Sequence, residues 1–232
     1  MSHREFSNLP ISKHLQAISD GLAKHRIATL QAPPGSGKTT ILPIFLAEQP
    51  WLQNKKILVL QPRRLAAKAV ARRMAELCGD QVGETVGYQM RMDRRVSAKT
   101  RVEIITEGLL TRRILSEPSL ADVGLIIFDE FHERSLNADI GLSLAHEITQ
   151  VLRDDLRLLI MSATLGSNPE SSIFESAWRY EFTSEPYPLT INYSHPEPRA
   201  LLWEYTARAI RNALAQYPGD VLAFLPGAFE IE

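Results

Sequence analysis

Residues 31–40 read Gln-Ala-Pro-Pro-Gly-Ser-Gly-Lys-Thr-Thr, and this stretch decides the fold. It lies between a short apolar run, residues 27–30, and a second one, residues 41–46, that can form a helix. Gly35 and Gly37 permit a tight turn in which successive backbone N–H groups and the start of a helix cradle a polyphosphate. The pattern predicts a phosphate-binding loop between a strand and a helix opened by Lys-Thr.

The same loop offers side chains for a nucleotide and its metal ion. In loops of this kind the lysine reaches the β- and γ-phosphates and the following hydroxyl ligates Mg²⁺, which assigns these roles to Lys38 and Thr39. The general pattern begins with glycine six residues before the lysine, where this sequence has Ala32. The alternative is a Gly-Pro turn that precedes Lys-Thr by chance. The candidate nucleotide-binding residues of the loop are Pro34, Gly35, Ser36, Gly37, Lys38, Thr39 and Thr40.

Composition narrows the class of protein. The 232 residues can hold one large domain, or one domain and part of another. With 44% hydrophobic and 23% charged residues, the composition is that of a soluble globular protein. The sequence has no apolar run of membrane-spanning length and no secretory signal at its N-terminus. Cys78 is the only cysteine, so it is interpreted as a packing residue, and we expect a cytoplasmic protein with no membrane partner.

Basic residues are concentrated in one part of the chain. The net charge of −1 gives no indication of nucleic-acid binding. Residues 61–113, however, contain twelve Lys and Arg residues and only six Asp and Glu residues. A solvated surface explains this excess equally well when it is considered alone.

Apolar runs alternate with amphipathic segments over about 160 residues. This alternation predicts an α/β fold, a mostly parallel sheet with helices on both faces. Ligands of such sheets bind beyond the carboxyl ends of the strands. The phosphate loop, Asp129-Glu130 and Ser162-Ala163-Thr164 all follow predicted strands. The strands are expected at 27–30, 56–60, 102–106, 125–128 and 156–161, a strand or hairpin at 83–91, and helices at 10–24, 65–77, 107–115 and 136–152.

The character of the sequence changes after Gly166. A short helix at 173–175 and a strand at 178–182 are followed by four prolines, at 186, 188, 196 and 198, which indicate a linker. We expect a first domain at 1–185, a proline-rich linker at 186–198 and a second domain beginning at 199–232. The last part contains one predicted helix, 201–217, and one predicted apolar strand, 220–225, without a partner sheet.

Two adjacent carboxylates complete the predicted nucleotide site. Asp129 and Glu130 follow an apolar strand, where one carboxylate can hold Mg²⁺ opposite Thr39 and the other can orient and deprotonate the attacking water. We assign Asp129 to the metal ion. Glu130 is assigned to the attacking water and is also a candidate ligand of the metal ion, with Thr39 and Asp129. A charged strand end without function is the alternative.

The order of motifs is similar to that of DEAH-box helicases. Residues 129–135, in the Asp-Glu-Phe-His form, resemble their motif II, and residues 32–40 resemble motif I, in which alanine replaces the first glycine. Motifs Ia, Ib, III and IV are matched at 61–67, 106–110, 162–164 and 224–227, and a hairpin signature at 86–91. Phe131, with Arg-Asp-Asp-Leu at 153–156, resembles the bacterial HrpB-like branch. The resemblance implies RecA-like P-loop domains, with 199–232 as the first helix–strand unit of a second one.

The resemblance also implies roles that spacing does not reveal. His132 would link the nucleotide site to motif III, which makes it a candidate catalytic residue with Lys38 and Glu130. Arg73 would stack on adenine, although a pair with Glu76 is an alternative. Ser162 and Thr164 would couple nucleotide to movement, and Arg63, Arg64 and Thr106 would bind single-stranded nucleic acid. His132 could instead be a structural hydrogen bonder, and Arg112 and Arg113 are equally well explained as a solvated face.

The expected function is that of the ATP-binding motor domain of a nucleic-acid helicase, with RNA favoured over DNA and with ATP and Mg²⁺ as cofactors. No Gln-Arg-x-Gly-Arg segment occurs in the sequence, so arginine fingers would come from a second RecA-like domain, next to a C-terminal region, of a longer protein. The 232 residues alone are predicted to hydrolyse ATP very weakly. Self-association through the unpartnered strand is a further expectation. A nucleotide-dependent interaction module and a P-loop ATPase or kinase unrelated to nucleic acid are the alternatives.

Overall fold

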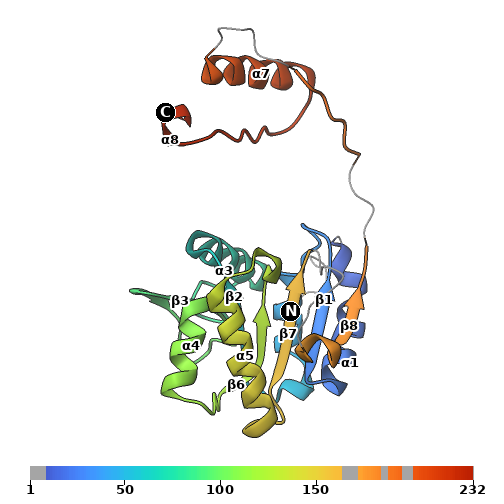
Figure 1. Cartoon of the computed structure of the whole chain (residues 1–232), viewed down its shortest axis with the longest axis vertical. Coiled ribbons are helices and arrows are strands. Elements are labelled where there is room, and N and C mark those ends of the chain that lie inside the picture. Colours follow the sequence, from blue (N-terminus) through green and yellow to red (C-terminus); the bar gives the residue numbers. More distant parts are fainter. Residues whose placement is uncertain (1–8, 164–171, 184–187, 195–200, 232) are drawn as a thin grey trace. The chain divides into compact units, whose positions relative to one another are not determined.

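The computed structural model describes residues 9–163, 172–183, 188–194 and 201–231. The chain forms two compact units, Met1–Glu185 and Pro186–Glu232. The first unit contains a sheet and most of the helices, and the second contains α7 (Leu202–Gln216) and α8 (Ala228–Ile231) (Figure 1). Within the described ranges, no helix is long and apolar enough to cross a bilayer.

An eight-stranded sheet organises the first unit. Its order is β4-β3-β5-β2-β6-β7-β1-β8, and every neighbouring pair is parallel except β3 and β4, which form an antiparallel hairpin at one edge. The prediction of a mostly parallel α/β sheet is confirmed. The strands are β1 (Ile27–Gln31), β2 (Lys56–Gln61), β3 (Val86–Met90), β4 (Asp93–Arg95), β5 (Val102–Thr106), β6 (Val123–Phe128), β7 (Arg157–Ser162) and β8 (Trp178–Glu181).

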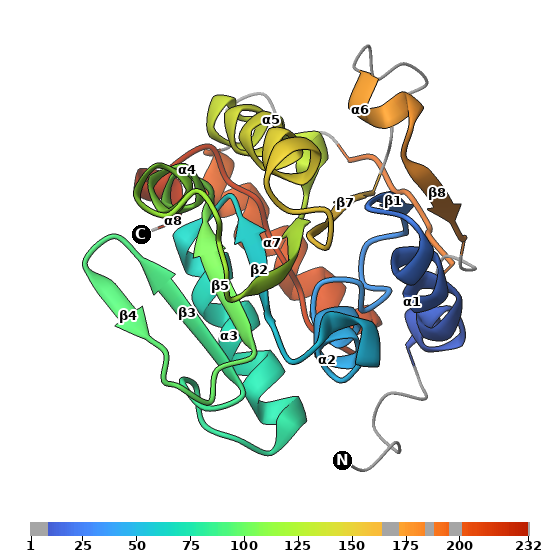
Figure 2. The ribbon, with the colours of Figure 1, turned by 90° about the horizontal axis from the view of Figure 1, so that it is seen from below.

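Helices cover both faces of this sheet (Figure 2). The helices α1 (Leu15–Lys24), α2 (Ile41–Ala47) and α3 (Arg64–Cys78) bury their apolar residues against one face. On the other face lie α4 (Glu107–Ser116), α5 (Leu136–Val151) and α6 (Ser172–Glu175). Burial on both faces explains why β6 is apolar at every position, since a central parallel strand has no solvent side.

Three helices end or begin where their sequences require it. Gly79 ends α3 in the left-handed conformation that glycine adopts without steric cost, with φ of 71°. Ser135 caps α5 by accepting a hydrogen bond from the Ala138 amide at 3.0 Å. The helix predicted at 10–24 is two elements in the structure. A 3₁₀ helix, Pro10–Lys13, comes first, and α1 begins at Leu15, after His14.

Gly21 in α1 has a packing role. A Cβ atom built at Gly21 would lie 2.3 Å from the indole ring of Trp178, the first residue of β8. The missing side chain lets the edge strand approach α1 closely. Trp178 also stacks on His25, with ring centroids 6.1 Å apart.

The strand predicted at 220–225 in the second unit is not formed. The helix predicted at 201–217 is present as α7, whereas residues 220–225 have no strand pairing within the described part of the chain. A strand requires backbone partners, and residues 201–231 supply none. Trp203, Ile210, Leu225, Phe229 and neighbouring side chains line a groove of about 550 Å³ between the faces of α7 and α8.

The lone thiol is not reactive. Burial, and then the carboxylates of Asp80 and Glu48, raise the pKa of Cys78 to about 11. The thiol is therefore protonated at neutral pH, which agrees with a packing role for Cys78.

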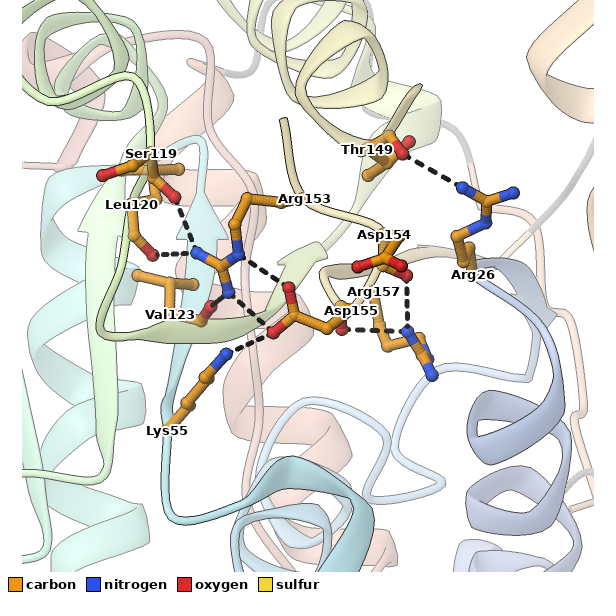
Figure 3. Close-up of polar contacts among 10 residues, drawn as sticks. All are labelled: Arg26, Lys55, Ser119, Leu120, Val123, Thr149, Arg153, Asp154, Asp155 and Arg157. Carbon is orange, nitrogen blue, oxygen red and sulfur yellow. Dashed lines mark hydrogen bonds and ion pairs between the residues drawn. The ribbon is translucent and has the colours of Figure 1, made fainter. Parts of the chain in front are cut away.

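A charged cluster joins the loops at the amino-terminal edge of the sheet (Figure 3). Arg153, which follows α5, donates to three backbone carbonyls of segment 119–123, at 2.6, 2.8 and 2.9 Å. Its Nε and Nη2 also bond the Asp155 carboxylate at 2.7 and 3.0 Å. Lys55, just before β2, pairs with the same carboxylate. These contacts tie together the loops that precede β2, β6 and β7.

We expect Arg153→Ala to lower the free energy of unfolding by about 2 kcal/mol or more, because three backbone carbonyls and Asp155 would lose the Arg153 donor. Asp155→Asn should cost less, about 1 kcal/mol at pH 7, since its side chain is 39% exposed. The Arg153 hydrogen bond, and then Lys55, hold the pKa of Asp155 below its usual range. Its stabilisation is therefore present above pH 4 and disappears as the pH falls further.

Urea denaturation at pH 7 and pH 3 measures both effects. Asp154→Asn is the matched control, because this neighbouring side chain is exposed. Equal destabilisation by Asp154→Asn and Asp155→Asn would contradict the assignment.

Candidate functional site

Four neighbouring strands deliver the predicted site residues to one edge of the sheet. The strands β2, β6, β7 and β1 are consecutive and parallel, so their carboxyl ends lie side by side. They lead into the Gln-Pro-Arg turn, Asp129, Ser162 and the phosphate loop, respectively. Residues separated by as much as 130 positions are therefore brought together by strand polarity alone.

The phosphate loop is a compact turn built on two glycines. Gly35 and Gly37 have φ of 72° and 93°, the left-handed region that side chains disfavour. The Ile11 amide donates to the Ser36 carbonyl at 3.0 Å and anchors the loop from outside. The α2 helix begins at Ile41, slightly later than the predicted opening at Lys-Thr, although the Ile41 amide already bonds the Gly37 carbonyl at 2.9 Å.

The interior of the loop contains polar groups that suit a phosphate. Ser36 is buried, and among the described residues its Oγ has no hydrogen-bond partner. Buried polar atoms in folded proteins are nearly always paired, so an orphan hydroxyl here points to a polar ligand. Lys38 is also buried, with 3% of its surface exposed.

Asp129 is a candidate metal ligand at this edge of the sheet. It is 3% exposed, and its Oδ1 accepts a hydrogen bond from the Glu130 amide at 2.9 Å. Gln61 donates to the other oxygen, Oδ2. The two residues predicted to hold Mg²⁺, Thr39 and Asp129, line the same cavity, and Thr39 is near enough to lower the pKa of the carboxyl.

Burial raises the pKa of Asp129 to about 6. The Thr39 hydrogen bond opposes this effect, the Glu130 carboxylate adds to it, and the Lys38 ammonium partly offsets it. A carboxylate that is poorly hydrated gains strongly from a divalent cation, because the cation replaces the missing water.

Glu130 contacts the two other candidate catalytic residues. Its Oε1 lies 3.4 Å from Nζ of Lys38, and its Oε2 lies 3.4 Å from Nδ1 of His132. Glu130 has φ of 50°, which is uncommon for a residue other than glycine. This conformation begins the 3₁₀ helix Phe131–Glu133 and turns the Glu130 side chain away from the line of β6.

Residues of the phosphate loop and of the segments after β2 and β6 line a cavity of about 390 Å³. Its walls include Thr39 and Thr40 of the loop, Gln61 and Arg63 of the turn after β2, and Asp129 and Glu130. Ala66 and Val70 of α3 extend the wall along one helical face, and Arg73 follows at the next position of that face. The donors and oxygen ligands fit a nucleoside polyphosphate with Mg²⁺, a cation that prefers one or two carboxylates together with phosphate oxygens and waters.

The residues expected to bind nucleic acid lie at neighbouring strand ends but have protein partners. Arg63 binds both carboxylate oxygens of Glu133, at 3.1 and 3.3 Å. Arg64 donates to the Arg91 carbonyl in the β3–β4 hairpin at 2.9 Å. Thr106 is the residue before α4 and is paired in register with Gln61.

Other predicted side chains are placed with varied outcomes. Arg73 lies 3.5 Å from Glu76, the weak pair that was foreseen as an alternative. Ser162 is buried at the end of β7, and its carbonyl accepts from the Ala32 amide at 3.2 Å, whereas Thr164 is outside the described residues. Arg112 is exposed, but Arg113 pairs with the buried Glu103 and is therefore not part of a solvated face.

Sequence reasoning missed two residues of the site, Gln61 and Glu133. Both lie inside recognised motifs, yet neither was assigned a role. A glutamine at the carboxyl end of an otherwise apolar strand was the available signal for Gln61. Glu133 could be identified only once the structure showed its pair with Arg63.

The site can now be compared with known proteins. A family model described as DEAD/DEAH box helicase matches residues 12–172. The ATP-dependent RNA helicase HrpB of Escherichia coli (strain K12) is 43% identical over 97% of this chain, and the ATP-dependent RNA helicase HrpA of Borreliella burgdorferi is 34% identical over 97%.

Solved structures give the same relationship. A crystal structure of the Escherichia coli DEAH/RHA helicase HrpB superposes with a TM-score of 0.88 at 43% identity, covering 97% of this chain. A crystal structure of the E. coli DExH-box NTPase HrpB gives a TM-score of 0.78. The chain spans only 28% of the length of each of these relatives.

Removing the charge of Asp129 is expected to stabilise the metal-free protein at neutral pH. A raised pKa means that the folded state disfavours the carboxylate, with a penalty present above pH 6 and absent below the ordinary value of 3.8. Asp129→Asn should raise the free energy of unfolding at pH 7.5 by up to about 2 kcal/mol, and the gain should shrink at pH 5.

Denaturation in EDTA at both pH values measures this difference. Asp20→Asn, at an exposed position of α1, is the control for a change of one charge. A variant less stable than the parent at both pH values would show that the hydrogen bonds of Asp129 outweigh its desolvation.

Proposed function

The chain belongs to the DEAD/DEAH box helicase family, and from this membership and the site geometry we propose that it is the ATP-binding motor domain of an RNA helicase. The placement of Thr39, Asp129 and Glu130 on the wall of one cavity carries this proposal. It joins a metal-binding hydroxyl, a poorly hydrated carboxylate and a candidate base at one point. Phosphoryl transfer to water requires this combination.

The residues of the loop would bind the phosphates. Backbone N–H groups around Gly35 and Gly37, with the Ser36 hydroxyl, would donate to the phosphate oxygens. Lys38 would reach the β- and γ-phosphates, and Pro34 and Thr40 would complete the loop. Mg²⁺, when bound, would neutralise charge that develops on the phosphates. Arg73 would stack on the adenine at the far end of the α3 face.

Glu130 would orient and deprotonate the attacking water, and His132 would connect it to the segment after β7. Ser162, at the end of β7, and Thr164 would couple the nucleotide to movement.

We assign the arginine fingers to a second RecA-like domain. This domain would follow a first domain at 1–185 and a proline-rich linker at 186–198. The unit at 199–232 would begin that second domain, and its exposed apolar residues at 221–225 are a candidate surface for self-association. Beyond it we place the C-terminal region of a longer, cytoplasmic protein.

Nucleic acid would bind where Arg63, Arg64 and Thr106 gather. The basic segment 61–113 supports this assignment, because phosphate contacts supply affinity that is independent of base sequence. The relatives named as RNA helicases favour RNA over DNA. The alternative is a nucleotide-dependent module that binds partners without translocating. Stimulation of ATP hydrolysis by RNA in the complete protein distinguishes the two functions.

Turnover should require both Glu130 and the rest of the protein. We expect the 232-residue chain to bind ATP and Mg²⁺ with very weak hydrolysis, because arginine fingers contribute about 10³–10⁵ in rate. In the complete protein, Glu130→Gln should leave ATP binding intact and lower RNA-stimulated turnover by about 10²–10⁴.

Phosphate release by parent and variant, with and without RNA, measures these effects. The control is Glu147→Gln, which removes an exposed carboxylate from α5, outside the cavity. Unchanged turnover in Glu130→Gln would remove Glu130 as the base, and rapid RNA-stimulated hydrolysis by the short chain would contradict the need for a second domain.

Arg63 must exchange its partner to bind a phosphate. Glu133→Gln should therefore raise the affinity of the chain for single-stranded RNA, by about two- to fivefold at low salt, because the pair with Glu133 no longer competes. Arg63→Ala should weaken binding and reduce the slope of log affinity against log salt by about one.

Fluorescence anisotropy with a labelled oligouridine measures both variants. Glu84→Gln removes the same charge from an exposed turn and controls for general electrostatics. Equal gains in Glu133→Gln and Glu84→Gln would show that net charge, rather than release of Arg63, sets the affinity.

A further inference from the structure

Gln61 occupies a position in the site for which the predicted chemistry has no assigned use. It is the last residue of β2, is 3% exposed, and lines the cavity beside Thr39 and Asp129. Polar side chains buried to this degree in an apolar sheet are expensive unless they are fully paired. The retention of an amide here therefore needs a reason.

Strand geometry places Gln61 next to the metal carboxylate. β2 and β6 are parallel neighbours with Leu60 paired to Phe128, and the Asp129 amide bonds the Leu60 carbonyl at 3.2 Å. Alternate residues of a strand share a face, so Gln61 lies on the face of Ile57 and Val59, which pack in the core beside α1, α2 and α3. The corresponding parity along β6 puts Asp129 on the same face, next to Gln61.

The two oxygens of the Asp129 carboxylate accept hydrogen bonds from two different segments of the chain. Nε2 of Gln61 donates to Oδ2, and the Glu130 amide donates to Oδ1 at 2.9 Å. The Glu130 bond is local and allows the carboxylate to rotate about it. The Gln61 bond comes from another strand and removes that freedom, so the carboxylate plane is set relative to Thr39.

The turn that follows Gln61 is fixed independently. Pro62 restricts the backbone immediately after the strand, and Arg63 is held by both oxygens of Glu133 on the 3₁₀ helix after Glu130. The turn after β2 is thus attached to the segment after β6 at two points. While Arg63 is paired with Glu133, this double attachment restrains the turn that holds Gln61 beside Asp129.

We propose that Gln61 is a positioning residue for the metal site, whose amide orients Asp129 so that its free lone pairs and the Thr39 hydroxyl can hold a divalent cation together. The proposal deepens the proposed function and rests on it. Hydrogen-bonding partners of metal ligands typically affect metal affinity by about 10- to 100-fold. Gln61 should therefore matter only when the cation is present.

The test compares binding of a fluorescent ATP analogue to the 232-residue chain in excess Mg²⁺ and in EDTA. In Gln61→Leu, which keeps bulk but no donor, the affinity gained from Mg²⁺ should fall by about tenfold while the affinity in EDTA stays within about twofold. Gln61→Glu keeps the length but puts a second carboxyl group beside Asp129, so its loss should be at least as large.

Two further variants separate positioning from general damage. Gln89→Leu removes another strand glutamine that bonds a charged side chain, Arg113, outside the cavity, and should leave both affinities unchanged. In Asp129→Ala the Mg²⁺ gain should already be lost, and adding Gln61→Leu should cost nothing more, because the two residues act as one unit.

The outcomes distinguish the two levels of the proposal. Equal losses in Mg²⁺ and in EDTA, unchanged affinities, or unfolding of both Gln61 variants at the assay temperature would each overturn the role of Gln61. A parent chain that binds no ATP analogue at all would overturn the proposed function itself. Mg²⁺-dependent binding that only the Gln61 and Asp129 variants lose would support both.

Discussion

The burial of one carboxylate is the constraint to which the rest of this site is adjusted. Asp129 ends the most completely buried strand of the sheet, where an anion is poorly hydrated, and its pKa of about 6 is the consequence. A hydroxyl, an amide side chain and a backbone amide converge on it from three different segments. None of these donors carries a full positive charge. The arrangement therefore supplies hydrogen bonds to the carboxylate, while only the nearby Lys38 ammonium offsets part of its charge, which favours a divalent cation.

The two edges of the sheet serve different purposes. At the amino-terminal edge, Arg153 and Asp155 join loops through hydrogen bonds and an ion pair. At the carboxyl edge, Arg63, Glu130 and Glu133, which form ion pairs, line a cavity. A parallel sheet separates these functions naturally, because one edge receives all the strand starts and the other all the strand ends.

Much of the fold could be predicted because its signals are local. Apolar runs bounded by glycine and polar residues located every strand of the first unit except β4, and alternation with helices indicated their parallel pairing. The phosphate loop and Asp129-Glu130 were found for the same reason, since each is a short contiguous motif. What could not be predicted depends on pairs distant in sequence. Gln61 and Glu133 acquire their partners only through the order of the strands, Gly21 is explained only by Trp178, and residues 220–225 lack the partner that an apolar pattern alone cannot guarantee.

The pair between Lys38 and Glu130 has a consequence for timing. While the Lys38 ammonium lies 3.4 Å from Oε1 of Glu130, that carboxylate oxygen is engaged by a cation. A polyphosphate competes for the same lysine with several negative charges. Its arrival would draw Lys38 away and leave Oε1 of Glu130 free at the moment when a phosphorus atom is in place. The bound nucleotide would thus release the carboxylate that is proposed to activate water.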